Sequence, residues 1–234
     1  MSPKVIEKNE EKKPYNKGDE YEDKIFKLMA GKGILLHGCK RAGAGVGCDA
    51  IFVHQGKSYN LEIKKDLFAD YGQKMLNWNK QDGWFWRTRD EINELYNKFG
   101  VLGHIRAKGI IPNKHSKPDK SLTVVDKKED QHNFEDTGLT VDCEALLKFY
   151  GEKNVFYIQI GEGYGFYCLS KDPAGLGVPK FDANFTLRLR AKTIHSEPIH
   201  MYGFYAVLKV RGKPKRSKYN IEDSLQQSFP PIKP

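Results

Sequence analysis

The sequence DAIFVHQGKSYNLEIKK, residues 49–65, restricts the fold more than any other part of the chain. Two short runs rich in apolar and aromatic residues flank a glycine-containing turn, and this pattern predicts a β-hairpin. Leu61 and Ile63 should point to one face of the second strand, because side chains alternate along a strand. Glu62 and Lys64 should then share the opposite face, so an acid and a base interrupt an otherwise apolar hairpin.

A second acid, Asp49, stands at the beginning of the first strand. Its parity along the strand is that of Ile51, so it must sit at the start of the strand or beside a bend to turn toward Glu62. Gly47 would supply the backbone freedom for such a bend. We therefore expect Asp49, Glu62 and Lys64 to converge within a few ångströms.

Two carboxylates beside an ammonium group suit the hydrolysis of phosphodiester bonds. Oxygen ligands favour Mg²⁺, which we expect Asp49, Glu62 and the backbone carbonyl of Ile63 to hold, with Mn²⁺ as a substitute. The metal would activate a water molecule. Lys64 would orient that water or help to deprotonate it, and would stabilise the charge on the phosphate.

An ordinary surface hairpin is the alternative interpretation. Glu62 and Lys64 would then form ion pairs with neighbours such as Lys57 or Asp66. This explains why charges occur in the hairpin, but not why they interrupt such apolar strands.

Asp49, twelve intervening residues and then Glu62-x-Lys64 resemble the active-site motif of the PD-(D/E)XK nuclease superfamily. That superfamily includes many type II restriction endonucleases, Holliday-junction resolvases and phage recombination nucleases. The resemblance covers about residues 18–77. The chain departs from the motif at Cys48, which stands where the motif has proline.

The resemblance implies two further site residues. Glu22 lies on the predicted helix before the hairpin, where many members carry an extra acid that binds the metal directly or through water. Gln73 lies on the predicted helix after the hairpin, where several members place a glutamine near the scissile phosphate. A solvated surface position is the alternative for both residues.

The charge balance points to a polyanionic partner. Lysine and arginine number 39 against 30 acidic residues, a formal net charge of +9, and this favours nucleic acid as partner. The residues expected to contact double-stranded DNA are Lys40, Arg41, Lys65, Arg188, Arg190, Lys192, Lys215 and Arg216. A merely flexible loop at the first two and a solvated basic tail at the last two are the alternatives.

The location follows from what the sequence lacks. No apolar run reaches the length of about 18 residues that a membrane-spanning helix needs. The charged first residues do not resemble a secretory signal. We therefore expect a cytoplasmic protein without membrane contact, and a homodimer is left open as a partner.

The predicted fold class is α/β (α+β), with a restriction-endonuclease-like core of a central mixed β-sheet flanked by helices and a β-rich C-terminal extension. Helices are expected over residues 17–31, 66–80, 89–99 and 141–151, and strands over 83–87, 101–111, 154–160, 166–170, 185–194 and 202–210. The expected organisation is a disordered arm at 1–16, a catalytic core at 17–111, a polar insertion loop at 112–138, a β-rich extension at 139–210 and a basic tail at 211–234.

These features together predict a Mg²⁺-dependent endonuclease that hydrolyses double-stranded DNA, as a sequence-specific type II restriction endonuclease does. A structure-selective nuclease, such as a junction resolvase or a phage recombination nuclease, is the alternative enzyme. A basic DNA-binding protein without catalytic activity is the alternative outside enzymes.

Overall fold

The computed structural model describes residues 16–39, 47–117, 122–135, 139–193 and 202–223. The helices are α1 (Lys17–Gly31), α2 (Glu91–Lys98), α3 (Val101–Ala107), α4 (Asn113–Ser116), α5 (Val124–Glu135) and α6 (Cys143–Glu152). The strands are β1 (Ala50–His54), β2 (Lys57–Lys64), β3 (Gly72–Asn79), β4 (Gly83–Trp86), β5 (Leu139–Val141), β6 (Val155–Ile160), β7 (Gly165–Cys168), β8 (Asn184–Thr193) and β9 (Tyr202–Arg211).

The first helix begins and ends where its sequence predicts. The Asn16 side chain accepts hydrogen bonds from the backbone N–H groups of Gly18 and Asp19, which caps the N-terminus of α1. Tyr21, Ile25 and Met29 lie one turn apart and are buried. This apolar stripe packs α1 against one face of the first sheet.

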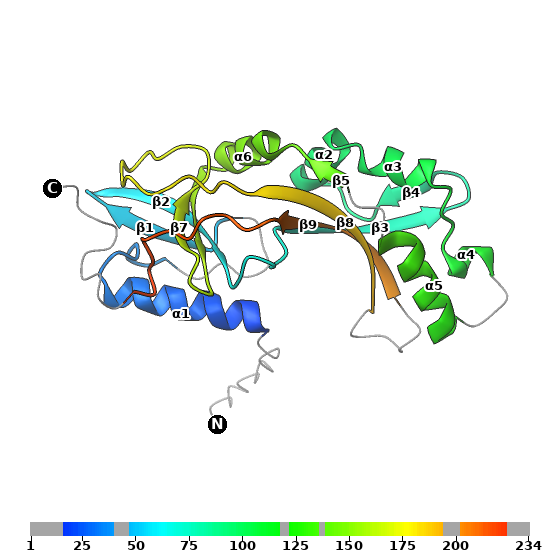
Figure 1. Cartoon of the computed structure of the whole chain (residues 1–234), viewed down its shortest axis with the longest axis horizontal. Coiled ribbons are helices and arrows are strands. Elements are labelled where there is room, and N and C mark those ends of the chain that lie inside the picture. Colours follow the sequence, from blue (N-terminus) through cyan, green and yellow to red (C-terminus); the bar gives the residue numbers. More distant parts are fainter. Residues whose placement is uncertain (1–15, 40–46, 118–121, 136–138, 194–201, 224–234) are drawn as a thin grey trace, which may run out of the picture.

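The first sheet is mixed and has the strand order β1-β2-β6-β7. The hairpin strands β1 and β2 are antiparallel, β6 lies parallel to β2, and β7 is antiparallel to β6. A parallel neighbour requires a long crossover connection, and here the crossover contains β3 to α6. The helices α1 and α6 lie on opposite sides of this sheet (Figure 1).

The second sheet is antiparallel and has the strand order β4-β3-β9-β8-β5. The long strands β8 and β9 arch across the molecule, with α2, α3 and α5 on the outer side of the curve (Figure 1). On that side Trp84, Phe134 and Phe204 form a buried aromatic cluster. The inner side of the curve has no helix of the described chain packed across it.

The mixed α+β class is confirmed, but the expected division at residue 111 does not match the sheets. The first sheet takes β6 and β7 from beyond that residue, whereas β3 and β4, which precede it, belong to the second sheet. A core of residues 17–111 is therefore wrong, because the strand that completes it comes from a distant part of the chain.

Three local expectations also differ from the structure. The helix predicted over 66–80 is a turn followed by β3, since pairing with β9 overrides the helical spacing of its apolar residues. The strand predicted over 101–111 is α3, in which Val101 and Ile105 are buried one turn apart. The predicted loop at 112–138 contains α4 and α5.

The basic segment after β9 is part of the fold as far as residue 223. Ile221 is fully buried, and the side chain of Gln159 accepts a hydrogen bond from its N–H at 3.2 Å. The Tyr21 hydroxyl donates to Glu222 at 2.8 Å. This segment thus ties α1 to the first sheet rather than forming a free tail.

Among the helices of the described residues, none combines the length and the apolar character needed to cross a membrane.

Candidate active site

The register of the hairpin brings Asp49 opposite Glu62. Ala50 pairs with Leu61, so the next residue outward on each strand lies across from the other and on the same face. Asp49 therefore sits at the start of the strand, as expected, and no bend is needed to turn it toward Glu62. Gly47, two residues earlier, has a φ of 148°.

The carboxylate of Asp49 extends the hydrogen bonding of the hairpin by one step. The N–H of Asp49 donates to the carbonyl of Leu61 at 3.1 Å. Its side-chain Oδ2 then accepts from the N–H of Ile63 at 2.7 Å. The side chain thus takes the place of a backbone acceptor just before β1 begins, which fixes the carboxyl beside β2.

Glu62 and Lys64 lie on one face of β2, as the alternation predicts. Leu61 and Ile63 are buried on the α1 side of the sheet, whereas Lys64 Nζ lies 2.6 Å from Glu62 Oε1 on the other side. Their side chains are only 16% and 13% exposed. An ion pair this sheltered is not the solvated surface pair of the alternative interpretation.

Burial and the neighbouring carboxylate change the ionisation of Asp49. Burial and then the charge of Glu62 raise the pKa of Asp49 from 3.8 to about 7, while Lys64 and the Ile63 N–H oppose the shift. Burial by itself lowers the pKa of Lys64, but Glu62, Asp49 and Glu22 raise it overall. Negative charge is therefore concentrated at this edge, and Lys64 remains protonated at neutral pH.

Glu22 belongs to the same electrostatic cluster. It is partly buried on α1, and its charge raises the pKa of both Asp49 and Lys64. Glu22 is thus close enough to Asp49 and Lys64 for its charge to affect both residues.

The charge of Glu62 also affects two buried tyrosines that no sequence pattern had indicated. Burial and the charge of Glu62 raise the pKa of Tyr150 well above its usual value, and Glu62 contributes to the raised pKa of Tyr71. The Tyr150 hydroxyl donates to the carbonyl of Tyr71 at 3.3 Å. Tyr150 lies on α6, so only the fold brings it to the hairpin.

The donor set fits a cation that keeps several water ligands. Within the part of the chain that the structure describes, no three side chains of His, Cys, Asp and Glu gather into a group that would enclose a metal. Two carboxylates, Asp49 and Glu62, remain, and Ile63, whose N–H donates to Asp49, follows Glu62 on β2. Mg²⁺ is commonly bound through one or two carboxylates, waters and substrate phosphate oxygens.

Gln73 lies elsewhere than expected. It is exposed on β3, not on a helix, and its side-chain oxygen accepts a hydrogen bond from Lys192. Lys192 also pairs with Asp70 at 3.1 Å. Gln73 pairs with Val207 of β9, which also pairs with Arg188 of β8, so these residues share the inner face of the second sheet.

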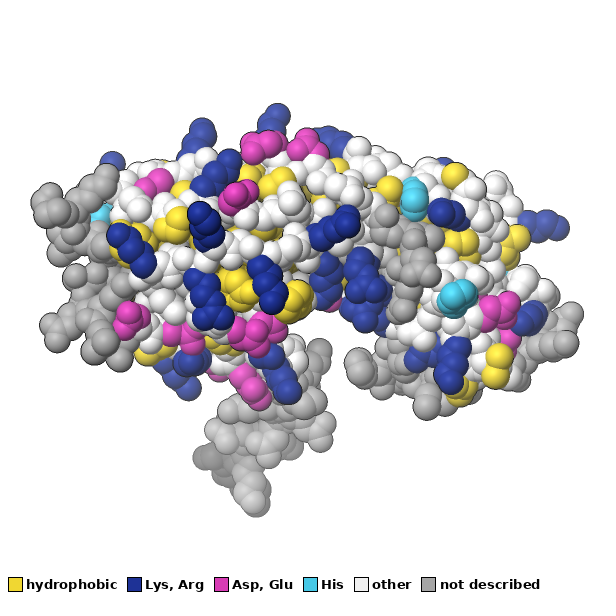
Figure 2. Space-filling view, viewed as in Figure 1, with side chains coloured by type: hydrophobic (Ala, Val, Ile, Leu, Met, Phe, Trp, Pro, Cys, Tyr) yellow, Lys and Arg dark blue, Asp and Glu magenta, His cyan; other side chains and the backbone are white. Residues whose placement is uncertain are grey.

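That inner face is basic. Leu187, Leu189 and Ala191 are buried on β8, and Arg188, Arg190 and Lys192 alternate with them. Lys209 lies on the same face, because its partner Thr186 has the parity of those three cations. Figure 2 shows a hollow beneath this sheet, between the two ends of the molecule, with Lys and Arg side chains gathered along its roof.

A second basic surface adjoins the turn between β6 and β7. Arg216 lies 5.4 Å from the ring centre of Tyr164, and the carbonyl of Lys215 accepts from the Tyr167 hydroxyl at 2.9 Å. A cavity of about 680 Å³ here is lined by cations that include Lys180, Lys213, Lys215, Arg216 and Lys218. The backbone that carries Lys215 and Arg216 is therefore anchored, and a fully solvated tail is not what the structure shows.

Three of the residues expected to contact DNA remain to be located. Lys65 follows the motif directly and is partly exposed, 3.7 Å from Asp66. Lys40 and Arg41 lie outside the described residues.

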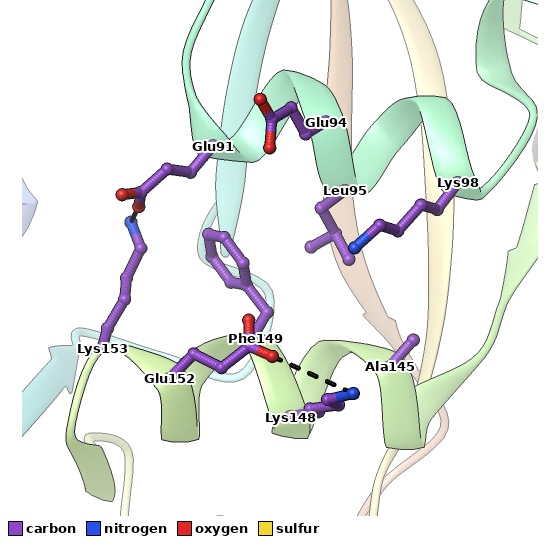
Figure 3. A pocket seen from close by; sticks show the side chains of 9 residues that line it. All are labelled: Glu91, Glu94, Leu95, Lys98, Ala145, Lys148, Phe149, Glu152 and Lys153. Atoms are coloured by element: carbon purple, nitrogen blue, oxygen red, sulfur yellow. Dashed lines mark ion pairs between the residues drawn. The ribbon is translucent and has the colours of Figure 1, made fainter.

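A further cavity lies between α2 and α6, away from the motif residues (Figure 3). It has a volume of about 360 Å³. Its lining alternates in charge: Glu91 pairs with Lys153 at 2.9 Å, and Lys148 with Glu152 at 4.0 Å. These pairs neutralise one another, so the cavity offers neither an acidic metal site nor a basic phosphate site.

Comparisons of the chain with protein-family models, with curated proteins and with solved structures found no match. The functional argument therefore depends on the geometry of the site.

Proposed function

We propose that this protein is a metal-dependent endonuclease that hydrolyses phosphodiester bonds in double-stranded DNA. The observation that carries the proposal is the convergence of Asp49, Glu62 and Lys64 at one end of the hairpin, within reach of the charge of Glu22. Lys64 compensates part of the negative charge of the two carboxylates, and a divalent cation would compensate the rest. A divalent cation is the partner that also suits a basic, polyanion-attracting chain.

Asp49 and Glu62, with the carbonyl of Ile63, are the residues that would hold Mg²⁺ or Mn²⁺. When bound, such a cation supplies positive charge to the phosphate and acidifies a water molecule. The hydrogen bond from the Ile63 N–H to Asp49 orients that carboxyl before any ligand arrives. The charge of Glu62 contributes to the raised pKa of both Tyr71 and Tyr150, so these buried rings belong to the surroundings of that carboxylate.

Lys64 is suited to the role of a cation rather than a base. Its raised pKa keeps it protonated, and Glu62 holds its ammonium group at 2.6 Å. It would therefore stabilise negative charge that builds on the phosphate and orient the attacking water by donating a hydrogen bond. Of the two roles expected from the sequence, deprotonation of the water is the one this environment disfavours.

The basic inner face supports DNA as the substrate. The strand β2 leads through residues 65–71 directly into β3 of the second sheet. Asp70 in that connection forms ion pairs with Lys192 and Lys209 of the basic face. A polyanion bound in the hollow would therefore pass close to the motif residues.

The test is DNA cleavage by a variant that changes one carboxylate. Glu62→Gln should lower the rate of plasmid cleavage in Mg²⁺ at least about 100-fold, because a charged oxygen at the metal is lost. Binding of the same DNA in EDTA should be retained, since no cation is removed.

The matched control is Glu94→Gln, an exposed glutamate on α2 that lines the cavity in Figure 3. It should cut as the wild type does. Cleavage by Glu62→Gln at the wild-type rate would show that the site is assigned wrongly. Discrete plasmid fragments would indicate a sequence-specific enzyme of the restriction type, and cleavage confined to branched or distorted DNA would indicate a structure-selective nuclease.

A further inference from the structure

One aromatic side chain stands out beside the candidate site. Phe68 is 59% exposed, whereas every other aromatic side chain of the described residues is buried or half-buried. Its neighbour Leu67 is fully buried. The fold thus turns one apolar side chain inward and holds the next, an aromatic ring, in solvent.

The backbone that carries Phe68 is anchored on both sides. Its carbonyl accepts a hydrogen bond from Lys209 Nζ at 2.5 Å. The N–H of Ala69 donates to Asp66 at 3.3 Å, and that of Tyr71 donates to Leu208 of β9 at 3.0 Å. The ring is therefore presented from a fixed turn, which lowers the entropy lost when a ligand stacks on it.

Lysines lie near Phe68, each beside an acidic side chain: Lys65 is 3.7 Å from Asp66, and Lys192 and Lys209 both pair with Asp70. Lys64 and Lys65 precede it along the chain, and Lys192 and Lys209 reach the same turn through Asp70. An aromatic ring between cations that attract phosphate is the combination that binds nucleic acid by stacking on a base. The side chain of a partner protein would not need the positive charge on both sides.

Phe68 is also close to the motif residues along the chain. It lies four positions after Lys64, so their Cα atoms are at most about 14 Å apart. Successive nucleotides of one strand are about 3.4 Å apart along a duplex. The backbone of Phe68 therefore lies within about four nucleotide steps of the backbone of Lys64.

We infer that Phe68 stacks on an unpaired base next to the scissile phosphate, so that DNA with a bulged or displaced base is the preferred substrate. This inference rests on the proposed function, and it names the substrate class of the same site. A base that is already unpaired costs the least to remove from the helical stack. The ring then gains a stacking partner while Lys65 and Lys209 lie near the flanking phosphates.

The test uses the full-length protein in EDTA, so that no DNA is cut. Two duplexes share one sequence, and one of them carries a single bulged 2-aminopurine, whose fluorescence falls when it stacks. The wild type should bind the bulged duplex about ten-fold or more tightly than the paired one, and it should quench the 2-aminopurine. Phe68→Ala should lose both the preference and the quenching, and Phe68→Tyr should retain both.

Two controls separate stacking from other effects. Phe68→Leu keeps an apolar side chain without a ring, so it should lose the quenching. Val125→Ala changes another exposed apolar residue, 72% exposed on α5, and should behave as the wild type does.

Quenching and preference in Phe68→Ala equal to those of the wild type would overturn the inference. So would a wild type that cuts plasmid in Mg²⁺ yet shows no preference for the bulge, and in that case the proposed function would stand. A wild type that binds neither duplex and cuts no DNA would overturn both.

Discussion

At the scale of single residues, the site is a cluster of charges in which the acids Asp49 and Glu62 outnumber the one base, Lys64. The carboxyl of Asp49 has a pKa near 7 because burial and Glu62 disfavour its ionised form. Lys64 offsets part of this repulsion, because its Nζ lies 2.6 Å from Oε1 of Glu62. The folded protein therefore retains a proton on Asp49 in a range of pH where an unfolded chain releases it.

This linkage predicts how stability depends on pH. Because the folded state binds more protons than the unfolded state between about pH 4 and pH 7, the free energy of unfolding should fall as the pH rises through that range. Asp49→Asn removes the titrating group but can still accept from the Ile63 N–H. In the absence of metal, its stability relative to the wild type should rise by about 2 kcal/mol between pH 4 and pH 8, a value reduced because water reaches part of the side chain.

Urea unfolding of both proteins at the two pH values measures this difference. A variant that follows the wild type in parallel across the range would show that Asp49 titrates normally. The neighbouring Cys48 does not contribute to this pH dependence, because burial raises the pKa of its thiol and the thiol stays neutral between pH 4 and pH 8.

At the scale of elements, the site depends on how tightly β6 closes against β2. The N–H of Gly161, just after β6, donates to the carbonyl of Lys64 at 2.9 Å. A Cβ at Gly161 would fall on the carbonyl oxygen of Lys65 and would meet the ring of Tyr21 at 2.9 Å. Only a glycine lets the turn after β6 approach the end of β2 so closely.

Gly161→Ala should therefore lower the free energy of unfolding by about 1–3 kcal/mol, because the neighbouring atoms must move apart. It should also reduce cleavage, because the displaced residues adjoin Lys64. Gly103→Ala in α3 is the control: no atom lies within 4 Å of its Cβ position, and alanine favours a helix by up to about 1 kcal/mol.

Thermal and urea unfolding of the two variants and the wild type measure these differences in stability. Equal stability of Gly161→Ala and the wild type would mean that the contact between β2 and the turn after β6 is loose.

Local patterns predict the hairpin, α1 and α6, but not the sheet that contains the hairpin. Alternation along residues 57–64 and helical spacing in α1 are short-range signals that the packing reinforces. Pairing of β2 with β6, and of β3 with β9, joins segments that are distant in sequence, and no local pattern encodes those partners. Asp49, Glu62 and Lys64 were predictable because they lie in or beside the hairpin, and Glu22 on α1 was expected from the resemblance alone. Tyr150 comes near Glu62 only through the fold.

At the scale of the whole molecule, positive charge is distributed unevenly around the hollow. The inner face of the second sheet carries Arg188, Arg190 and Lys192, while the helices on the outer side carry mixed charges that pair with one another. The hollow in Figure 2 is thus the surface that would attract DNA. Its contribution to binding should be electrostatic and independent of sequence.

The dependence of DNA affinity on salt tests this assignment. Replacing both Arg188 and Arg190 with alanine should reduce the slope of log affinity against log salt by about 2, since each phosphate contact contributes about 0.9. Lys148→Ala removes a cation that is 79% exposed on α6, on the outer side, and should leave the slope nearly unchanged. Equal slopes for the double variant and for Lys148→Ala would place the DNA elsewhere.

The binding of a divalent cation by Asp49 and Glu62 is the claim on which the account of catalysis depends. Mn²⁺ is paramagnetic, so titration at pH 8 with detection of the free ion by electron paramagnetic resonance measures its binding directly. The account predicts that the wild type and Glu94→Gln bind Mn²⁺ alike, and that Asp49→Asn and Glu62→Gln each bind it at least about ten-fold more weakly. Unchanged Mn²⁺ affinity in both of these variants would contradict it.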